Sequence, residues 1–250
     1  MNSKKCVAII DGDVLIYRSC HKSMKEYEGK QVKVLFDNLY KELLEDLGCD
    51  ENYLHISGGN NFRKEIGTEF IDYKGKRKEK PSNYRECKEH VFNKYDVICK
   101  EGYEADDSAA VQAMEVKKKG DLFILCTVDK DWKQIGGLFY NTQYKSLSAM
   151  TNYECITFFH KQLLTGDAVD NVTGIYGIGE VKANRLLNND KVIKQFDTII
   201  RTYKEHHPDD YIQRLNAMGA MLWLVRDYND PIWNVDWWIK QLQKFQNENN

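Results

Sequence analysis

Lys5-Cys-Val-Ala-Ile-Ile-Asp-Gly-Asp13 is the stretch from which the fold class can be inferred. Its five central residues are apolar without interruption, which is typical of a strand buried on both faces. Two carboxylates, Asp11 and Asp13, follow directly. Strands of this kind lie in parallel sheets covered by helices, where polar sites form outside the carboxyl ends of the strands.

Strand-like and helix-like segments alternate through the first two-thirds of the chain. We expect strands at 5–10, 53–56, 97–99 and 122–128, and helices at 32–47, from Ser82 onward and at 105–119. The helix at 32–47 has apolar residues at helical spacing, and Gly48 marks its end. This alternation predicts an α/β fold with a mainly parallel, twisted sheet flanked by helices.

The remainder of the chain has a helical pattern. Helices are expected at 158–165, 181–187, 192–203 and 211–227. The aromatic stretch 231–239 is expected to pack onto the body of the protein. We therefore predict an α/β core at 1–155 and a helical region at 156–250 that is packed on it.

Composition indicates a globular protein. The chain has 250 residues, 42% hydrophobic and 30% charged, with a net charge of −2. No apolar stretch approaches the ~20 residues that a membrane span needs, and the N-terminus lacks the pattern of a signal peptide. The expected location is the cytoplasm. Seven scattered cysteines without a Cys-x-x-Cys pair argue against a disulfide framework or a zinc site.

Carboxylates gather in four short clusters, three of which follow strand-like runs. They are Asp11 and Asp13; Glu104, Asp106 and Asp107; Asp129 and Asp131; and Asp167 and Asp170. At ~4 Å and an effective dielectric constant of ~20, each pair of like charges costs about 4 kcal/mol. If these acids converge, a cation must lie among them, and oxygen ligands favour Mg²⁺ or Mn²⁺.

Each acidic cluster has an ordinary explanation when it is taken singly. Acids are common in the first turn of a helix, as at Glu104–Asp107, and in turns after strands, as at Asp129. Taken together, they suit a pair of ions that activates a water and stabilises the leaving oxygen in phosphodiester hydrolysis. None of the six histidines falls beside the acids of these four clusters in the sequence.

Two further stretches suit a phosphate backbone. Three glycines, Gly174, Gly177 and Gly179, allow a tight turn into a helix that carries Lys182 and Arg185, and backbone N–H groups of such a turn can bind phosphate. Residues 74–80 contain five basic residues. A solvated loop is the alternative explanation for this basic run.

The motifs around these acids resemble those of the 5′-nuclease family, which comprises flap endonucleases and 5′→3′ exonucleases, and especially the stand-alone phage type. The matching motifs are Gly-Tyr-Glu-Ala-Asp-Asp, Thr-Val-Asp-Lys-Asp-Trp, Thr-Gly-Asp-Ala-Val-Asp-Asn and Gly-Ile-Tyr-Gly-Ile-Gly, in the family's order within residues 5–190. The resemblance implies a PIN-like core and two metal sites that hold Mg²⁺ or Mn²⁺. Asp11, Glu104, Asp106 and Asp107 would serve the first site, Asp129 would lie between the two, and Asp131, Asp167 and Asp170 would serve the second.

The same resemblance implies how DNA is held. A helix–three-turn–helix element near 163–190 would grip the duplex through Gly174, Gly177, Gly179 and Lys182, and it often holds a K⁺ ion. Residues 62–96 would form a short arch-like segment that contains Arg63 and Lys76, in which Lys74 and Arg77 contact the scissile phosphate. Tyr17 and Arg18 match positions that stack on the terminal base and hold a phosphate.

In one place the chain departs from the family. Many relatives carry another metal-binding Asp after the second strand, where this chain has Ser57-Gly-Gly-Asn-Asn61. The resemblance therefore implies a first metal site that is one carboxylate short.

The expected function is that of a monomeric, structure-specific, metal-dependent 5′→3′ exonuclease or flap endonuclease acting on DNA in replication or repair, with RNA primers as further candidate substrates. One alternative is a ribonuclease of the PIN type, although PIN nucleases generally lack the glycine turn. Another is a non-catalytic module that binds branched DNA. A binding module has no use for clustered charge that repels phosphate.

Overall fold

The computed structural model describes residues 4–26, 31–66, 69–76, 79–188 and 191–248, with the side chains of 22–26 left out. The chain forms two compact units. The first comprises Met1–Asn61, Lys78–Met150 and Leu224–Asp227, and the second comprises Phe62–Arg77, Thr151–Trp223 and Tyr228–Asn250. The sequence places the division near residue 155 and assigns the segment 62–77 to the core, whereas the structure groups this segment with the second unit.

A sheet of six strands forms the centre of the first unit, in the order β3-β2-β1-β4-β5-β6. The strands are β1 (Cys6–Asp11), β2 (Glu51–His55), β3 (Val97–Ile98), β4 (Leu122–Thr127), β5 (Gly137–Asn141) and β6 (Ser146–Met150). All neighbours are parallel except β5 and β6. The prediction of a mainly parallel sheet is confirmed. The sequence did not predict β5 and β6, and β6 is largely exposed, so it lacks the apolar run by which the buried strands were recognised.

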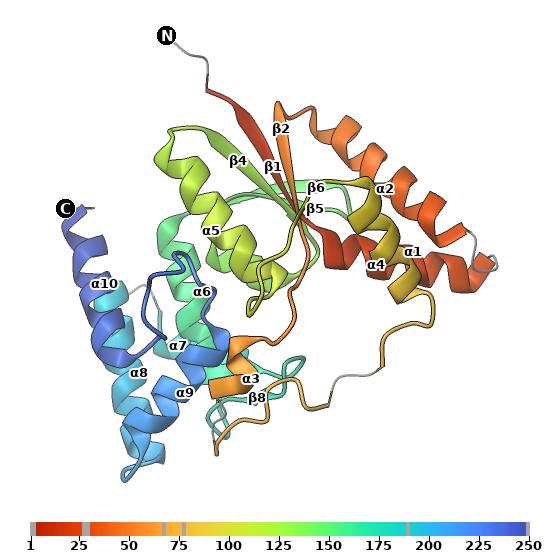
Figure 1. Ribbon diagram of the computed structural model, residues 1–250. Coiled ribbons are helices and arrows are strands. Elements are labelled where there is room, and N and C mark those ends of the chain that lie inside the picture. The colour runs from red at the N-terminus through yellow and green to blue at the C-terminus, as the bar shows by residue number, and fades with distance from the viewer. Residues whose placement is uncertain (1–3, 27–30, 67–68, 77–78, 189–190, 249–250) are drawn as a thin grey trace. The chain divides into compact units, whose positions relative to one another are not determined.

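Helices cover both faces of this sheet (Figure 1). One face is covered by α1 (Gly12–Glu26), α2 (Val32–Leu47) and α4 (Tyr84–Lys94), and the other by α5 (Ala105–Lys118). The bounds of α2 agree with the prediction, and Gly48 ends this helix in a left-handed conformation with φ 57°. Helix α1 was not predicted, and it begins directly after β1. The acids at Asp11 and Asp13 therefore lie on either side of a strand–helix junction.

Helices dominate the second unit. Its elements are α3 (Phe62–Ile66), α6 (Asn152–Thr165), β7 (Gly166–Asp167), β8 (Val172–Thr173), α7 (Glu180–Leu186), α8 (Val192–His206), α9 (Tyr211–Leu222) and α10 (Val235–Glu248). Helix α6 begins earlier than expected because Thr151 and Glu154 form a capping box. Helix α9 ends at Leu222 rather than at residue 227, since the chain returns at Leu224 to the first unit.

The aromatic tail is part of the core of the second unit. Trp233 and Trp238 are each 3% exposed, and the ring of Phe159 lies edge-on to both. The indole N–H of Trp238 donates to Nε2 of His160 over 3.1 Å. The expectation that this stretch packs onto the body of the protein is thus met within its own unit, where it forms part of the unpredicted helix α10.

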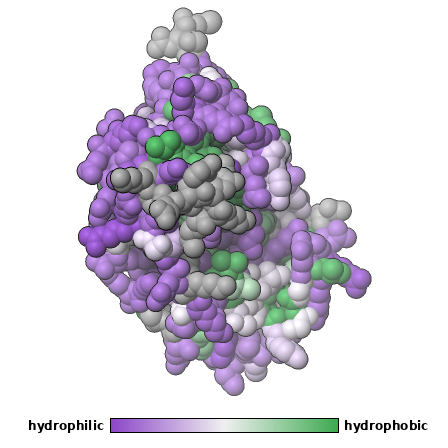
Figure 2. Space-filling model, turned by 90° about the vertical axis from the view of Figure 1, so that its right-hand side faces the viewer, coloured by the Kyte–Doolittle hydropathy of each residue, from purple (hydrophilic) through white to green (hydrophobic). Residues whose placement is uncertain are grey.

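Figure 2 shows a face on which hydrophilic residues predominate and hydrophobic ones form small, separate patches. Among the residues that the structure describes, no helix is both long and apolar enough to cross a membrane.

Candidate active site

Asp11 is the central acid of the first unit. It is the last residue of β1 and is 3% exposed. Thr127 Oγ1 donates to its Oδ2 over 2.6 Å, and the backbone N–H of Val14 donates to its Oδ1 over 3.0 Å. Burial, together with the nearby charges of Asp13 and Asp129, raises the pKa of Asp11 to about 7, against the lowering effect of these hydrogen bonds. The protein thus holds a carboxylate in a place that disfavours its charge.

Asp129 and Asp131 follow β4 at the same edge of the sheet. Asp129 precedes the short 3₁₀ helix η2 (Lys130–Gln134), and its Oδ1 accepts a hydrogen bond of 2.9 Å from the N–H of Asp131. Because β1 and β4 are parallel neighbours, Asp129 follows β4 at the edge where Asp11 ends β1. The sequence-based expectation that acids after different strands meet at one sheet edge is met for these residues.

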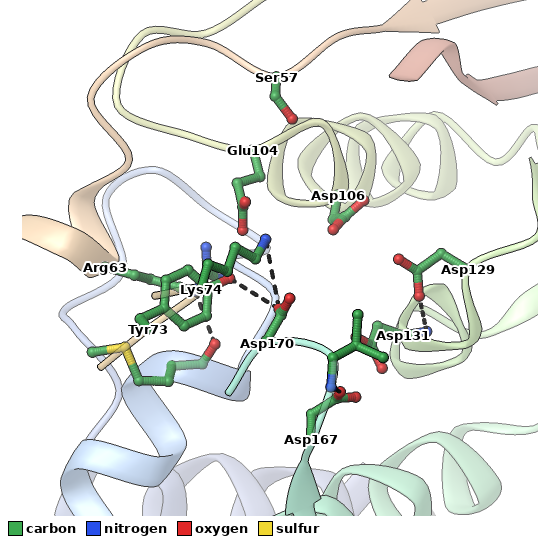
Figure 3. Close-up of polar contacts among 12 residues, drawn as sticks. Ser57, Arg63, Tyr73, Lys74, Glu104, Asp106, Asp129, Asp131, Asp167 and Asp170 are labelled. Atoms are coloured by element: carbon green, nitrogen blue, oxygen red, sulfur yellow. Dashed lines mark hydrogen bonds and ion pairs between the residues drawn. The ribbon is translucent and has the colours of Figure 1, made fainter. Parts of the chain in front are cut away.

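Helix α5 brings two more acids to this site. Glu104 caps the helix by accepting from the N–H of Asp107, and Asp106 Oδ1 accepts a hydrogen bond of 2.7 Å from the indole N–H of Trp132. Trp132 is fully buried in η2, so this bond ties the start of α5 to the turn that carries Asp131. Glu104, Asp106, Asp129 and Asp131 are all half-buried, and Figure 3 labels their side chains.

Asp107, predicted as a metal ligand, accepts hydrogen bonds from backbone N–H groups in this structure. Its side chain is fully buried. Oδ2 accepts from the N–H of Glu104 over 3.3 Å, and Oδ1 accepts from the N–H of Val225 over 3.0 Å. Both oxygens bind backbone N–H groups and solvent does not reach the side chain, and because of this burial we correct the assignment of Asp107 from metal binding to holding the first turn of α5.

One histidine was missed as a neighbour of the acids. His55 ends β2 and pairs in register with Asp11 on β1, although 43 residues separate the two along the chain. Its Nδ1 lies 2.9 Å from Ser108 Oγ, and burial lowers its pKa to about 3. His55 is therefore neutral at ordinary pH. Only the sheet register reveals this neighbour, because spacing along the chain carries no signal for it.

In the second unit, Lys74 and Tyr73 bind Asp170. Lys74 Nζ lies 3.5 Å from Asp170 Oδ2, and Tyr73 Oη donates to the same oxygen over 3.2 Å (Figure 3). The N–H of Lys74 also donates to the carbonyl oxygen of Asp170 over 2.8 Å. Asp167 is 3% exposed in β7, and its Oδ1 accepts from the N–H of Val169. Lys74, predicted to contact phosphate, is thus placed beside an acid that was predicted to bind metal.

Arg63 does not lie at a surface that DNA could reach in this structure. Its side chain is 2% exposed. Nε donates to the carbonyl oxygen of Met221 over 3.0 Å, and Nη2 donates to that of Trp223 over 2.6 Å. These carbonyls belong to the end of α9, so the guanidinium satisfies groups that lack partners within the helix. The prediction of a DNA contact at Arg63 is wrong.

The other residues predicted to contact DNA differ in their exposure and in their contacts with the protein. Arg18 donates to the carbonyl oxygen of Thr142 over 3.0 Å, and the Tyr17 ring packs 5.0 Å from that of Tyr84. Lys76 is exposed, whereas Arg77 lies outside the described residues. Tyr17 and Arg18 are thus engaged with the protein, and Lys76 is open to solvent.

The glycine turn links β8 to α7 in the second unit. Gly177 has φ 76°, which only glycine adopts readily, and a side chain at Gly174 would overlap the backbone of Thr165. Gly179 precedes α7, on which Lys182 is exposed. The expected order of helix, turn and helix is present as α6, the β7–β8 turn and α7.

Comparison with known proteins identifies the family. A family profile described as the 5′-3′ exonuclease, N-terminal resolvase-like domain, matches residues 6–161. The chain belongs to the 5′→3′ exonuclease family. The 5′-3′ exonuclease of Mycoplasmopsis pulmonis (strain UAB CTIP) is 24% identical over 209 residues, which cover 78% of this chain and 70% of that protein. DNA polymerase I of Geobacillus stearothermophilus is 26% identical over 219 residues, and the match covers 24% of its length.

Solved structures share this fold. The T5 5′-exonuclease with bound zinc matches with a TM-score of 0.65 at 20% identity, covering 87% of this chain and 86% of that one. The bacteriophage T5 D15 flap endonuclease, in a complex with DNA and metal ions, matches with a TM-score of 0.61 at 17% identity, covering 96% and 98%.

The acids of the first unit suit a hydrated divalent cation. Within the described residues, no three His, Cys, Asp or Glu side chains stand close enough together to hold an ion directly. Mg²⁺ usually binds one or two carboxylates and keeps several waters, so it does not need three. The donors at this edge are all carboxylates, and the charges of Asp13 and Asp129 raise the pKa of Asp11. A cation would relieve this repulsion, and on this observation the acids of the first unit fit the metal.

Proposed function

We propose that the protein is a structure-specific 5′→3′ exonuclease and flap endonuclease that hydrolyses phosphodiester bonds of DNA with two Mg²⁺ or Mn²⁺ ions. The observation that carries this proposal is the row of carboxylates at the carboxyl edge of the parallel sheet, where Asp11 and Asp129 follow neighbouring strands. Family membership supports the reaction class, since the profile covers β1 to α6. RNA at a primer end is a further proposed substrate.

Under this proposal, the carboxylates of the chain bind the two ions and Lys74 contacts the phosphate. Divalent cations, when bound, activate the attacking water and neutralise charge on the leaving oxygen. Asp11, Glu104 and Asp106 would serve the first ion and Asp131, Asp167 and Asp170 the second, in part through waters that each ion retains, with Asp129 between them. Lys74 would exchange its contact with Asp170 for one with the scissile phosphate once a cation neutralises that acid.

DNA would be held by the glycine turn and by exposed basic residues. The backbone N–H groups at Gly174, Gly177 and Gly179 and the ammonium group of Lys182 offer contacts to phosphate without reading sequence. K⁺ at this turn, Tyr17 stacked on a terminal base and a phosphate held by Arg18 are further parts of the proposal. The last two require that both residues leave the contacts seen here.

Cleavage of a labelled substrate tests the proposed function. A duplex with a 5′ flap and a nicked duplex, each labelled at its 5′ end, are incubated with Mg²⁺, with Mn²⁺ and with EDTA. We expect short labelled products with either metal and none with EDTA. Asp129→Asn is expected to reduce the rate at least 100-fold, while the exposed Glu45→Gln on α2 leaves it unchanged. Uncut DNA that remains bound would instead indicate a binding module, and preferred cleavage of single-stranded RNA would indicate a PIN-type ribonuclease.

A further inference from the structure

One of the central strands lacks an acid at the carboxyl edge. Strands β2, β1 and β4 are consecutive parallel neighbours. Asp11 ends β1 and Asp129 follows β4, but Ser57 stands after β2. The Ser57 hydroxyl is already engaged, because its Oγ accepts a hydrogen bond of 3.0 Å from the N–H of Ala105, the first residue of α5.

The residues after Ser57 leave no room for a carboxylate. A Cβ atom at Gly58 would overlap the carbonyl oxygen of Lys100. The N–H of Gly58 donates to the carbonyl oxygen of Tyr103 over 3.0 Å. The backbone after β2 thus packs closely against the loop that leads into α5. An acid at position 58 would require this loop to be rebuilt.

The carboxylate of Asp13 lies at this place instead. Its Oδ2 accepts from the N–H of Ser57 over 3.0 Å, and its Oδ1 accepts from the hydroxyl of Tyr84 over 3.0 Å. Close packing fixes this position, since a Cβ atom at Gly12 would stand 2.7 Å from the carbonyl oxygen of His55. The first turn of α1 is therefore held against the end of β2.

Asp13 can still take part in a site. Its side chain is half-buried, so solvent reaches it. Each carboxylate oxygen has two acceptor positions, so one hydrogen bond per oxygen leaves capacity for a second partner. Ser57, whose N–H donates to Asp13, also accepts from the N–H of Ala105 at the start of α5. These contacts place Asp13 beside the turn that carries Glu104, and Asp13 follows Asp11 by two residues.

We propose that Asp13 supplies to the first metal site the carboxylate that the end of β2 lacks, as a positioning residue that accepts hydrogen bonds from the water ligands of the divalent cation. The inference rests on the proposed function. Mg²⁺ retains several waters in proteins. Mutation of a residue that binds such ligands from outside typically lowers metal affinity 10–100-fold. With Asp13 counted, the first site has the negative charge that an acid at position 57 would have supplied.

A purely structural role for Asp13 makes a different prediction. If Asp13 serves only to hold Ser57 and Tyr84, loss of its charge affects folding and leaves metal affinity alone. Asp13→Asn keeps the shape and one acceptor oxygen but removes the charge. Tyr84→Phe removes one hydrogen bond of Asp13 and keeps the charge. Comparison of these two variants separates the effect of the charge on metal affinity from the effect of the hydrogen bond.

The experiment measures Mn²⁺ binding without DNA, by titration calorimetry and by the electron paramagnetic resonance of free Mn²⁺. We expect Asp13→Asn to weaken the tighter Mn²⁺ site about 10-fold or more, and Tyr84→Phe to change it less than threefold. Glu45→Gln, an exposed acid on α2, controls for net charge. Thermal melting of each variant in EDTA reports folding separately.

A swapped variant tests position directly. The double variant with Asp13→Ser and Ser57→Asp moves the carboxylate to the end of β2, where an Asp can still accept from the N–H of Ala105. We expect it to recover Mn²⁺ affinity to within threefold of the wild type, and Asp13→Ser alone to remain weak. This pair decides the outcome even if Asp13→Asn folds poorly.

The outcomes separate this inference from the function on which it rests. If the wild type cleaves flaps and binds Mn²⁺, and Asp13→Asn binds it equally well, the role of Asp13 is overturned and the proposed function stands. If the wild type neither binds Mn²⁺ nor cleaves DNA, both proposals fall. Weak binding in Asp13→Asn with recovery in the swapped variant supports both.

Discussion

The hydroxyl of Thr127, the last residue of β4, donates a hydrogen bond of 2.6 Å to Oδ2 of Asp11, the last residue of β1. This bond joins the ends of two neighbouring strands at a buried acid. It stabilises the charged form of Asp11, but burial and the nearby carboxylates have the larger effect and raise the pKa of Asp11 to about 7. The site is therefore least stable when it is fully ionised and free of metal.

The raised pKa of Asp11 predicts how stability depends on pH. Between the ordinary value of 3.8 and about 7, the folded chain holds a proton on Asp11 that the unfolded chain has released. The free energy of unfolding therefore falls as pH rises through this window. Asp11→Asn removes the effect, and we expect it to be more stable than the wild type by roughly 1–3 kcal/mol at pH 8 in EDTA.

Urea unfolding at several pH values between 4 and 8 measures this difference. The advantage of Asp11→Asn is expected to shrink toward pH 4, and added Mg²⁺ is expected to stabilise the wild type more than the variant. Asp46 is the matched control, since its hydrogen bond to Lys145 lowers its pKa. Asp46→Asn should bring no advantage at high pH. A constant difference for Asp11→Asn across the whole range would contradict the assignment.

The buried position of Arg63 predicts a stability effect in place of a direct DNA effect. Arg63→Ala leaves the carbonyl oxygens of Met221 and Trp223 without this donor, which is expected to cost about 2–4 kcal/mol. Its exposed neighbour Lys64 is the control, and Lys64→Ala should change the melting temperature little. Equal melting temperatures for Arg63→Ala and the wild type, with weakened DNA binding, would restore the original interpretation.

Tyr176 is predicted to contact DNA. It is 96% exposed in the glycine turn, beside Gly177, where an aromatic side chain gains nothing from packing. Under the proposed function, Tyr176→Ala should weaken binding to a nicked duplex about fivefold or more, which is the range for an aromatic residue at an interface. Fluorescence anisotropy with Ca²⁺ in place of Mg²⁺ measures it.

A second exposed tyrosine gives the control for this experiment. Tyr144 is 74% exposed in the turn between β5 and β6, and Tyr144→Ala should leave the affinity unchanged. Neither variant should alter the melting temperature. Equal affinity loss in both would mean that exposed tyrosines act without regard to position, and the glycine turn would lose its assigned role.

Two half-buried thiols, Cys6 and Cys49, lie close together where β1 and β2 begin, and their oxidation tests the packing there. Cys6 Sγ lies 3.2 Å from Cys49 Sγ, and both are free. A disulfide bond needs ~2.05 Å, so a small movement suffices. Diamide treatment should link Cys6 to Cys49 within one chain, as detected by peptide mapping without reduction, and Cys6→Ser should abolish the link. Preferred pairing of Cys6 with the exposed Cys99 would contradict the register of β1 and β2.

The sequence was most informative where one residue type has one physical meaning. The apolar run before Asp11 predicted a buried strand, and Gly48 predicted the end of a helix; the structure has both. The acids after β1 and β4 could be placed on one edge because parallel strands share their direction. These predictions needed no knowledge of which side chains meet.

The sequence was least informative where distant backbone atoms decide a side chain's role. Arg63 and Asp107 carry the charges that a nucleic-acid or metal site needs, yet carbonyl and N–H groups about 118–160 residues away bind them. His55 meets Asp11 through sheet register. The relation between Asp13 and Ser57 likewise depends on how α1 leaves β1. No local pattern contains this information.

The short stretch Leu224–Asp227 has a consequence for how the protein can be divided. These residues belong to the first unit, where the N–H of Val225 binds Asp107 and the N–H of Leu224 binds Gln134. Their contacts hold the two turns, at the start of α5 and in η2, that carry Asp106 and Asp131. A fragment cut after the α/β region would therefore lose part of the scaffold of its own acidic site. The sequence family is recognised up to residue 161, but the last residues of the first unit, which brace these turns, extend some sixty-six residues further along the chain, to Asp227.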